Sequence, residues 1–260
     1  MSVAARTGVV ITMAGLGSRF AEAGYRVPKY EIVARGRTLF AWSMESLHSF
    51  IDHSCPFHFI ARSESGSPNR ARDFIAQECA VLGIANYEVI TIDSPTDGQA
   101  TTALLARQCW EDVCDPVAIY NIDTYVANEA MDVHDIRGAG WIPCFAGSGD
   151  KWSFAAADDE GIVTEVREKQ RISPHATLGL YWFDSFGRYI DAYRRYYSDP
   201  LRIEARERYI APLYNQLIED GARVYMQVVP ADQVFPLGTP EDVRLFEALP
   251  SGNLAAVGSV

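Results

Sequence analysis

Short apolar runs alternate with amphipathic segments along the first half of the chain. Four runs have the length and composition of buried strands, at residues 8–13, 56–61, 87–93 and 117–122. Apolar residues recur near a 3.6-residue period over 38–50, and further helices are predicted over 68–82 and from the turn at 94–98 to about residue 110. This alternation of strand and helix predicts parallel strands joined by right-handed crossovers.

The second half has shorter strands and lacks the regular alternation with helices. Strands are predicted at residues 141–147, 152–157, 162–166, 177–183 and 223–229. The first four are expected to extend the sheet in mixed or antiparallel directions and to line a pocket. Helices are predicted over 184–197, over 210–220 and in an amphipathic segment that ends near 249. We therefore predict an α/β fold with a mixed, mostly parallel central sheet flanked by helices, in one domain over 1–250 with a flexible tail over 251–260.

Composition and charge argue against several classes of protein. At 260 residues, with 48% hydrophobic and 22% charged residues, the chain is typical of a globular protein, and its apolar runs are too short to span a bilayer. The N-terminal Met-Ser-Val-Ala-Ala-Arg has no apolar signal region, so a cytoplasmic protein is expected. A net charge of −11 argues against binding to nucleic acid or to an anionic membrane, so a phosphate site in this chain must be built locally.

Neither the cysteines nor the histidines follow a metal-binding or catalytic spacing. The five cysteines have no C-x-x-C pair, so reduced cysteines that pack in the core are expected, in place of a zinc site or a disulfide framework. The five histidines lack H-x-x-x-H spacing, and no Ser-His-Asp pattern supports nucleophilic catalysis.

A candidate anion site begins where the first apolar run ends. Residues 14–19, Ala-Gly-Leu-Gly-Ser-Arg, contain two glycines that permit a tight turn whose backbone N–H groups face phosphate oxygens. Arg19 and Lys29, the latter directly after Pro28, supply positive charge for such an anion. The alternative is a sharp turn with two surface cations. The pattern is neither a dinucleotide fingerprint, since Phe20 stands at the third glycine position, nor a Walker loop, since no Gly-Lys-Ser/Thr follows.

Three stretches that follow predicted strands are expected at one edge of the sheet. They are residues 13–19, 94–98 and 121–123, and ligands of open parallel sheets bind outside the carboxyl ends of the strands. Asp123 follows the strand at 117–122, and we expect it to bind a hard cation such as Mg²⁺ together with substrate phosphates. The alternative role for Asp123 is a cap of the segment that follows.

A second candidate site is the pair Glu168-Lys169, which follows the predicted strand at 162–166. Adjacent opposite charges usually mark a solvated turn. If this turn faces the same pocket, Glu168 accepts hydrogen bonds from a sugar or polyol while Lys169 holds its phosphate. The aromatic residues of 189–197 are expected in the core, or at the interface of a homo-oligomer.

In their order along the chain, these residues resemble the nucleotidyltransferases that couple a nucleoside triphosphate to a sugar phosphate, the nucleotide-sugar pyrophosphorylases. The matching motifs are Gly15-Leu-Gly-Ser-Arg-Phe20, Pro28-Lys29, Asp97-Gly98, Asn121-Ile-Asp123, Glu168-Lys169, Gly179-Leu-Tyr181 and Gly238-Thr-Pro-Glu-Asp242. They run in family order and span nearly the whole chain. The resemblance implies a Rossmann-like GT-A fold, Mg²⁺ as cofactor, and release of pyrophosphate.

The resemblance also implies a role for each candidate residue. The half at about 1–137 would bind the nucleotide, through Ala14, Gly15, Leu16, Gly17, Ser18, Gly98 and Asn121. Arg19 would stabilise the leaving phosphates, Lys29 would lie between the α-phosphate and the acceptor phosphate, and Asp123 would bind the metal. The half at about 138–250 would bind the acceptor, through Glu168, Lys169 and Gly179.

One position departs from the family pattern. Sugar-phosphate members usually carry a second metal-binding Asp two residues before the final Gly-Thr, where this chain has Pro236, and Asp232 is the nearest acidic residue upstream. The Pro-Leu-Gly-Thr-Pro-Glu-Asp form over 236–242 is similar to the capsule-associated branch of the family, whose acceptors include sugar phosphates and other small phosphorylated metabolites. A pyrimidine base is favoured, because the Asp97-Gly98 turn offers little room beside the loop.

Three functions are compatible with these features. The first is transfer of a nucleotidyl group from a nucleoside triphosphate to a small phosphorylated acceptor. The second is a GT-A glycosyltransferase with Asp123 at its metal site; Arg19 and Lys29 argue against it, because a nucleotide sugar has no pyrophosphate leaving group. The third is a catalytically silent nucleotide-binding regulatory module, which the missing Asp before Gly238 supports.

Overall fold

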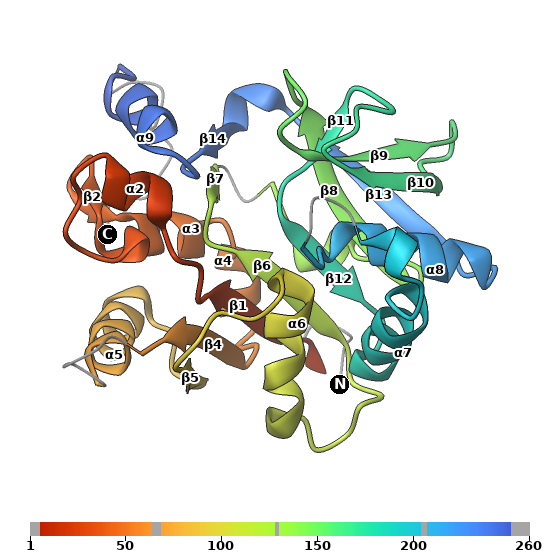
Figure 1. Ribbon diagram of the computed structural model, residues 1–260, viewed down its shortest axis with the longest axis horizontal. Coiled ribbons are helices and arrows are strands. Elements are labelled where there is room, and N and C mark those ends of the chain that lie inside the picture. The colour runs from red at the N-terminus through yellow and green to blue at the C-terminus, as the bar shows by residue number, and fades with distance from the viewer. Residues whose placement is uncertain (1–5, 64–68, 128–129, 204–206, 251–260) are drawn as a thin grey trace.

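A computed structural model describes residues 6–63, 69–127, 130–203 and 207–250 (Figure 1). Its centre is a ten-stranded sheet with strands from both predicted halves of the chain. These strands are β1 (Gly8–Met13), β4 (Phe57–Arg62), β5 (Tyr87–Ile92), β6 (Val117–Asn121), β8 (Gly140–Ala146), β9 (Ser153–Ala157), β10 (Val163–Glu168), β11 (His175–Thr177), β12 (Leu180–Phe183) and β13 (Val224–Val229). Their order across the sheet is β10-β9-β11-β8-β12-β6-β1-β4-β5, with β13 paired to β8.

The first half of the chain forms a parallel region, as its alternation of strands and helices predicts. β1 lies between β4 and β6 and is parallel to both, with Val9 opposite Phe57 on one side and Ala118 on the other. β5 continues this region as the edge strand, parallel to β4. Val9, Val10 and Ile11 are fully buried, because both faces of β1 are covered.

The second half extends the sheet in mixed directions, which confirms the predicted fold class. β12 is antiparallel to both β6 and β8, and so joins the two regions. β9, β10 and β11 continue with antiparallel pairing, whereas β13 lies parallel to β8. The result is a Rossmann-like sheet whose central strands are mostly parallel.

Helices cover both faces of this sheet. The α-helices are α2 (Ser18–Glu22), α3 (Leu39–Glu45), α4 (His48–Asp52), α5 (Arg70–Leu82), α6 (Gln99–Leu104), α7 (Phe186–Tyr196), α8 (Tyr214–Glu219) and α9 (Pro240–Glu247). Short 3-10 segments are η1 (Lys29–Glu31), η2 (Leu105–Cys109), η3 (Val133–Asp135), η4 (Pro200–Arg202), η5 (Ala211–Leu213) and η6 (Ala231–Gln233). Val9 and Ile11 pack in a cluster with α3, α4 and α5, while Val10 between them packs in a cluster with α6, α7 and α8.

Two predicted elements are divided in the structure. The helix predicted over 38–50 is two helices, α3 and α4, because the chain turns at Leu47, which has φ −104° and ψ 21°. The strand predicted over 177–183 is interrupted between β11 and β12, where Gly179 has φ +83°. The helix predicted over 68–82 begins at Arg70, and its first predicted residue, like the predicted tail at 251–260, lies outside the described residues.

Two short ladders were not predicted. One pairs β2 (Val33–Ala34) with β3 (Arg37–Thr38), and the other pairs β7 (Thr124–Val126) with β14 (Val234–Pro236), both antiparallel. Next to the second ladder, the backbone N–H of Leu237 donates to the carbonyl of Asp123 at 2.7 Å. This ladder therefore joins the segment after β6 to the segment that leads into α9.

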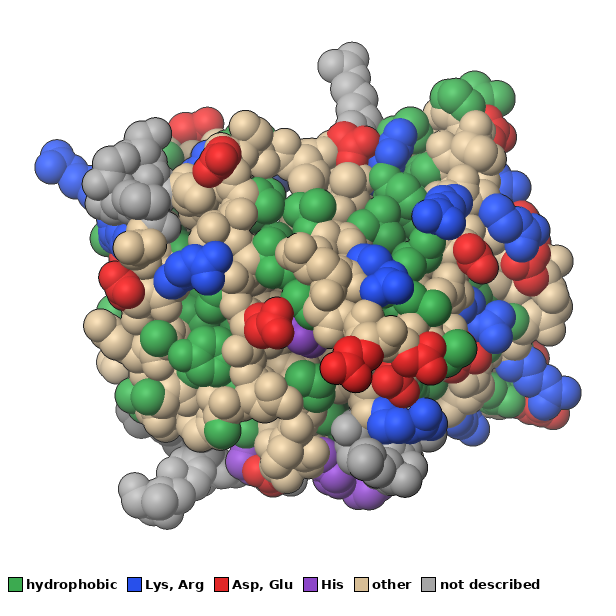
Figure 2. Space-filling model, turned by 90° about the horizontal axis from the view of Figure 1, so that it is seen from below, with side chains coloured by type: hydrophobic (Ala, Val, Ile, Leu, Met, Phe, Trp, Pro, Cys, Tyr) green, Lys and Arg blue, Asp and Glu red, His purple; other side chains and the backbone are tan. Residues whose placement is uncertain are grey.

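The charges on the surface and the burial of the aromatic residues of 189–197 can both be seen in the structure. In the part of the chain that the structure describes, no helix combines the length and the apolar character needed to cross a bilayer. Acidic and basic side chains are interspersed on the face shown in Figure 2. Tyr189, Tyr196 and Tyr197 are buried against the sheet, so the core alternative holds for these three aromatic residues.

Candidate functional site

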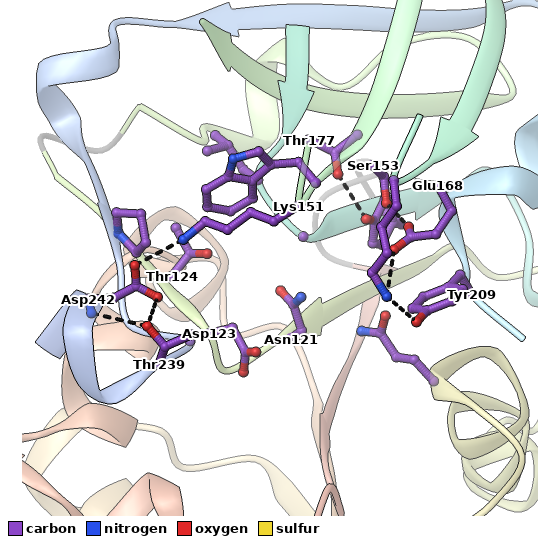
Figure 3. Close-up of a pocket in the computed structure, with 18 of the residues that line it drawn as sticks. Asn121, Asp123, Thr124, Lys151, Ser153, Glu168, Thr177, Tyr209, Thr239 and Asp242 are labelled. Carbon is purple, nitrogen blue, oxygen red and sulfur yellow. Dashed lines mark hydrogen bonds and ion pairs between the residues drawn. The ribbon is translucent and has the colours of Figure 1, made fainter. Parts of the chain in front are cut away.

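A cavity of about 270 Å³ lies between the carboxyl ends of the central parallel strands and the second half of the sheet (Figure 3). In Figure 3, Thr239 and Asp242 stand at one end and Glu168 and Tyr209 at the other. Six of the predicted site residues line it: Arg19, Asn121, Asp123, Glu168, Lys169 and Gly179. Residues from distant parts of the sequence thus meet at the predicted edge of the sheet.

The predicted anion loop leads from β1 into α2. Ala14 is buried, whereas Gly15 and Leu16 are exposed to solvent. Gly17 has φ +61°, a left-handed conformation that favours glycine, and its carbonyl accepts the first hydrogen bonds of α2. The loop therefore brings Arg19, in the first turn of α2, to the cavity.

Lys29 forms an ion pair with Asp123 beside the cavity. Its Nζ lies 2.5 Å from Asp123 Oδ1 and 5.7 Å from the centre of the Phe20 ring. The Lys29 side chain is 14% exposed and the Asp123 side chain 49% exposed. The ammonium is thus held inside the protein, while the carboxylate keeps part of its surface open to a ligand.

Gly179 contacts Asn121 so closely that no side chain fits there. Its backbone carbonyl accepts from the Asn121 N–H at 3.2 Å, and a Cβ on Gly179 would lie 1.8 Å from Asn121 Oδ1. Asn121 Oδ1 is buried and, within the described residues, has no hydrogen-bond partner. Gly179 therefore sets the position of an amide that lines the cavity.

Gly179→Ala is expected to destabilise the fold by at least about 1–3 kcal/mol and to displace Asn121, because both the positive φ and the 1.8 Å approach oppose a Cβ. Gly221→Ala is the matched control, since Gly221 has φ +75° but no atom within 4 Å of the added Cβ. Denaturant unfolding of both variants measures the difference. Equal losses in the free energy of unfolding for the two variants would mean that the close contact between residue 179 and Asn121 contributes nothing to the loss.

The pair Glu168-Lys169 ends β10 at the far side of the cavity. Glu168 is buried and accepts from Ser153 Oγ, and Lys169 Nζ lies 3.7 Å from Glu168 Oε1. Lys169 has φ +52°, unusual for a residue with a side chain, and its Nζ donates to Tyr209 Oη at 2.6 Å. The charge pair is thus a positioned part of the cavity wall.

The protonation of this pair favours a cationic Lys169. Burial alone would lower the pKa of Lys169, but the bond to Tyr209 and the charges of Glu168 and Glu207 outweigh it, so the net pKa is raised. Burial raises the pKa of Tyr209, against the lowering effect of Lys169. Lys169 is therefore charged at neutral pH, as a phosphate ligand must be.

Gly98 precedes α6 and lies against the segment before η5. Its φ is +147°, and an added Cβ would lie 2.4 Å from the backbone N and O of Arg208. The backbone of Arg208 bonds Asp97 and Ala100 on either side. Next to Gly98, Gln99 Nε2 donates to Thr12 Oγ1 at 3.0 Å and lines the cavity.

Asp242 is a second carboxylate at the same end of the cavity as Asp123. Oδ2 of each lies near Gly238, at 3.6 Å for Asp123 and 3.7 Å for Asp242 from the position of a Cβ on this glycine. The other oxygen of each bonds a lysine, Lys29 for Asp123 and Lys151 at 3.0 Å for Asp242. Oδ2 of Asp242 also accepts from Thr239 Oγ1 at 2.7 Å, and carboxylate oxygens are the ligands that a hard divalent cation prefers.

Neither of the two positions considered for the second metal ligand places a ligand atom in the cavity. Pro236 lines the cavity but has no ligand atom on its side chain. Asp232 is exposed in η6 and is not among the residues that line the cavity. Of the acidic residues on this C-terminal segment, Asp242 is the one in the cavity wall.

All lysines of the chain belong to this region. The sequence contains three, Lys29, Lys151 and Lys169, against twenty arginines. Lys151 and Lys169 line the cavity, and Lys29 bonds the Asp123 that lines it. Arg19 lines the cavity with them, so positive charge reaches it from separate parts of the chain.

Sequence reasoning missed several residues of the cavity wall: Gln99, Lys151, Ser153, Thr177, Tyr209 and Asp242. Two of them stand out in the sequence. Asp242 is the last residue of the motif Gly238-Thr-Pro-Glu-Asp242, and Lys151 is one of only three lysines in the chain. Ser153 and Tyr209 carry none, because they reach the cavity through strand pairing and chain crossing that the sequence does not display.

No protein-family model matches the sequence, and no curated protein matches it. Solved structures do. A nucleoside-diphosphate-sugar pyrophosphorylase from Vibrio cholerae RC9 is 33% identical, with a TM-score of 0.83 over 93% of this chain and 100% of that chain. The inositol-1-phosphate CTP transferase from T. maritima is 13% identical, with a TM-score of 0.71 over 95% of this chain and 93% of that chain. The CTP:phosphocholine cytidylyltransferase from Streptococcus pneumoniae is 15% identical, with a TM-score of 0.67 over 93% and 98%. The last two show a shared fold.

Proposed function

The chain belongs to the nucleoside-diphosphate-sugar pyrophosphorylase family, and we propose that it uses this cavity to transfer a nucleoside monophosphate from a nucleoside triphosphate to a sugar phosphate, releasing pyrophosphate. The observation that carries the proposal is the convergence of Arg19, the Lys29–Asp123 pair and Lys169 on one cavity. A site of this kind has cations at both ends for two phosphorylated substrates. The enzyme is a nucleotidyltransferase.

The triphosphate is assigned to the loop between β1 and α2. The backbone N–H groups of residues 14–18 face the phosphate oxygens, and Arg19 faces the leaving phosphates. Gly98 and Asn121 border the base and the ribose. Gly98 supports this assignment, because a side chain there would collide with the Arg208 backbone. We further propose a pyrimidine base, since this closely packed turn leaves little space.

The acceptor is assigned to the opposite wall. Glu168 is held by Ser153 and accepts hydrogen bonds from the acceptor's hydroxyl groups, while the charged Lys169 holds its phosphate. Gly179 lines this wall and contacts Asn121, where a Cβ would collide with Oδ1. The acceptor class is a sugar phosphate or a similar small phosphorylated metabolite, as in the capsule-associated branch. We place the reaction in the cytoplasm, where nucleoside triphosphates are made.

The reaction is an in-line displacement at the α-phosphorus. An oxygen of the acceptor phosphate forms the new P–O bond, the bond between the α- and β-phosphates breaks, and pyrophosphate leaves with the bonding electrons. The attacking oxygen is already anionic, so no general base is needed. Lys29 draws the two anionic reactants together, and Arg19 neutralises the departing charge; positioning and charge neutralisation supply most of the rate.

Asp123 and Asp242, which both line the cavity, would hold a divalent cation such as Mg²⁺ through their carboxylate oxygens. When bound, it would neutralise charge on the triphosphate. Asp242 then takes the place of the Asp that Pro236 replaces. Each carboxylate also bonds a lysine, Lys29 at Asp123 and Lys151 at Asp242, so a cation held there would share the two carboxylates with these ammonium groups.

Asp242→Asn is expected to lower kcat by about 10–100-fold and to raise the Mg²⁺ concentration needed for half-maximal rate, because a cation ligand is lost while the side chain still accepts from Thr239. Glu241→Gln is the matched control: it lies beside Asp242 and pairs with Arg244 on the surface. Asp232→Asn tests the upstream alternative. A Mg²⁺ response that changes with Asp232 and not with Asp242 would assign the ligand to η6.

A pyrophosphate-release screen tests the function. It crosses four nucleoside triphosphates with phosphorylated sugars, polyols and choline phosphate, using the wild-type chain. The expected result is rapid release with one base and one acceptor class. Consumption of a nucleotide sugar, with transfer of its sugar, would favour the glycosyltransferase. Tight triphosphate binding without release for any pair would favour the regulatory module.

A further inference from the structure

A second group of side chains that can bind a metal lies at the opposite end of the sheet from the cavity. His58 and Glu88 are the second residues of β4 and β5, and they are direct partners across these parallel strands. Cys109 ends η2, the segment that continues α6. The candidate active site lies at the carboxyl ends of the parallel strands, whereas these residues lie near the amino ends. The group is therefore separate from it.

The three ligand atoms are close enough to share one ion. One ring nitrogen of His58, one carboxylate oxygen of Glu88 and Sγ of Cys109 all lie within 4.8 Å of one another. Ligand bonds to zinc are about 2.0–2.3 Å long, so an ion placed among the three atoms lies close to bonding distance from each of them. The donors come from three elements that the core already holds in place.

His58 is buried without satisfying its own polar atoms. Its side chain is 6% exposed, and Nδ1 finds no hydrogen-bond partner among the described residues. Buried nitrogen atoms nearly always have a partner, so an orphan of this kind calls for an explanation. A buried imidazole with an unpartnered nitrogen, next to a carboxylate and a thiol, offers a donor that transition metal ions commonly bind.

Each of the three donors has different surroundings. Trp110 packs against the His58 ring in a tilted arrangement, with ring centres 4.7 Å apart, and stacks on Phe186 at 4.6 Å, which keeps the His58 ring in place beside η2. Burial and a hydrogen bond to Glu88 raise the pKa of Cys109 to about 12, so the thiol keeps its proton in the absence of a metal. Glu88 is exposed, which leaves one side of the group open to water.

The donor set selects the kind of ion. Magnesium and calcium prefer sites made of oxygen alone, whereas zinc and related transition ions take imidazole and thiolate together with carboxylate. We propose that His58, Glu88 and Cys109 bind one divalent transition ion of the zinc type, with water as a further ligand. The ion joins η2 to β4 and to the edge strand β5. Binding displaces the Cys109 thiol proton to solvent.

Cobalt binding to the chelator-treated full chain tests this proposal. The expected result is one equivalent of Co²⁺ with a near-ultraviolet cobalt–thiolate absorption band and release of about one proton at neutral pH. Cys109→Ala loses the band and the proton. Cys114→Ala, the matched control, keeps both, because Cys114 is an exposed thiol outside the group. Asp123→Asn also keeps both, which separates this site from the cation site of the cavity.

Two further variants remove the other donors. His58→Gln and Glu88→Gln are expected to weaken cobalt binding by about tenfold or more, the lower end of what loss of even an outer partner costs a metal site. Circular dichroism checks the fold of each; Glu88 is exposed, so its variant keeps the test valid if His58→Gln unfolds. A band that survives in Cys109→Ala, or a wild-type chain without the band, would overturn the proposal.

Discussion

Lys29→Ala is expected to lower kcat for nucleotidyl transfer by about 10²–10³ with the fold intact, which is the usual cost of removing one preorganised charge contact. The reason is its position. The ammonium is 14% exposed, bonds Asp123 at 2.5 Å and lies next to the loop assigned to the triphosphate. Initial rates of pyrophosphate release, measured at saturating substrates, give the change in kcat.

Two further variants serve as comparisons for Lys29→Ala. Lys29→Arg keeps the charge in a planar, forked form and is expected to fall between the wild type and the alanine variant. Arg244→Ala removes a cation on α9 that pairs with Glu241 at the surface, and its rate should equal that of the wild type. Near-wild-type turnover by purified Lys29→Ala would remove this residue from the reaction.

Asp123→Ala is expected to cause a loss of similar size, about 10²–10³ in kcat, and to abolish the dependence of the rate on Mg²⁺. The Asp123 side chain is 49% exposed and lines the cavity, and its Oδ2 lies near Gly238, as does Oδ2 of Asp242. Metal titrations of the rate in Asp123→Ala, Asp123→Asn and the wild type measure this effect.

The stability of the Asp123 variants provides a control for folding. The ion pair with Lys29 contributes about 1 kcal/mol or less to the free energy of unfolding, because the carboxylate is 49% exposed. A double-mutant cycle with Lys29→Ala separates this small coupling from the catalytic loss. Undiminished, Mg²⁺-dependent turnover by folded Asp123→Ala would exclude Asp123 as a cation ligand.

The fold could be predicted from the sequence wherever burial alone decides the local structure. Val9, Val10 and Ile11 read as a strand because both faces of β1 are covered, and the same holds for β4 and β6. The β7–β14 ladder escaped prediction because three-residue strands leave too few positions for a period of two. Its pairing depends on chain segments more than a hundred residues apart, and these meet only in the folded protein.

The candidate site likewise contains residues that could be predicted from the sequence and residues that could not. Residues at strand ends, such as Asn121 and Asp123, could be predicted because topology alone sends them to one edge of the sheet. Asp242 ends a motif that the sequence displays, but its place in the cavity wall depends on the β7–β14 ladder and on the bond from Leu237 to Asp123 next to it. The spacing of the cysteines and of the histidines gave no sign of the group at His58, because His58 and Glu88 meet only as partners on adjacent strands.

Phosphorus NMR of one reaction mixture tests the central claim most directly. Wild-type enzyme, Mg²⁺, the preferred nucleoside triphosphate and a sugar phosphate are predicted to yield pyrophosphate and a nucleoside-diphosphate sugar in equal amounts, with no turnover when the sugar phosphate is omitted. Pyrophosphate with free nucleoside monophosphate in place of the diphosphate sugar, or an unchanged spectrum despite bound nucleotide, would contradict it.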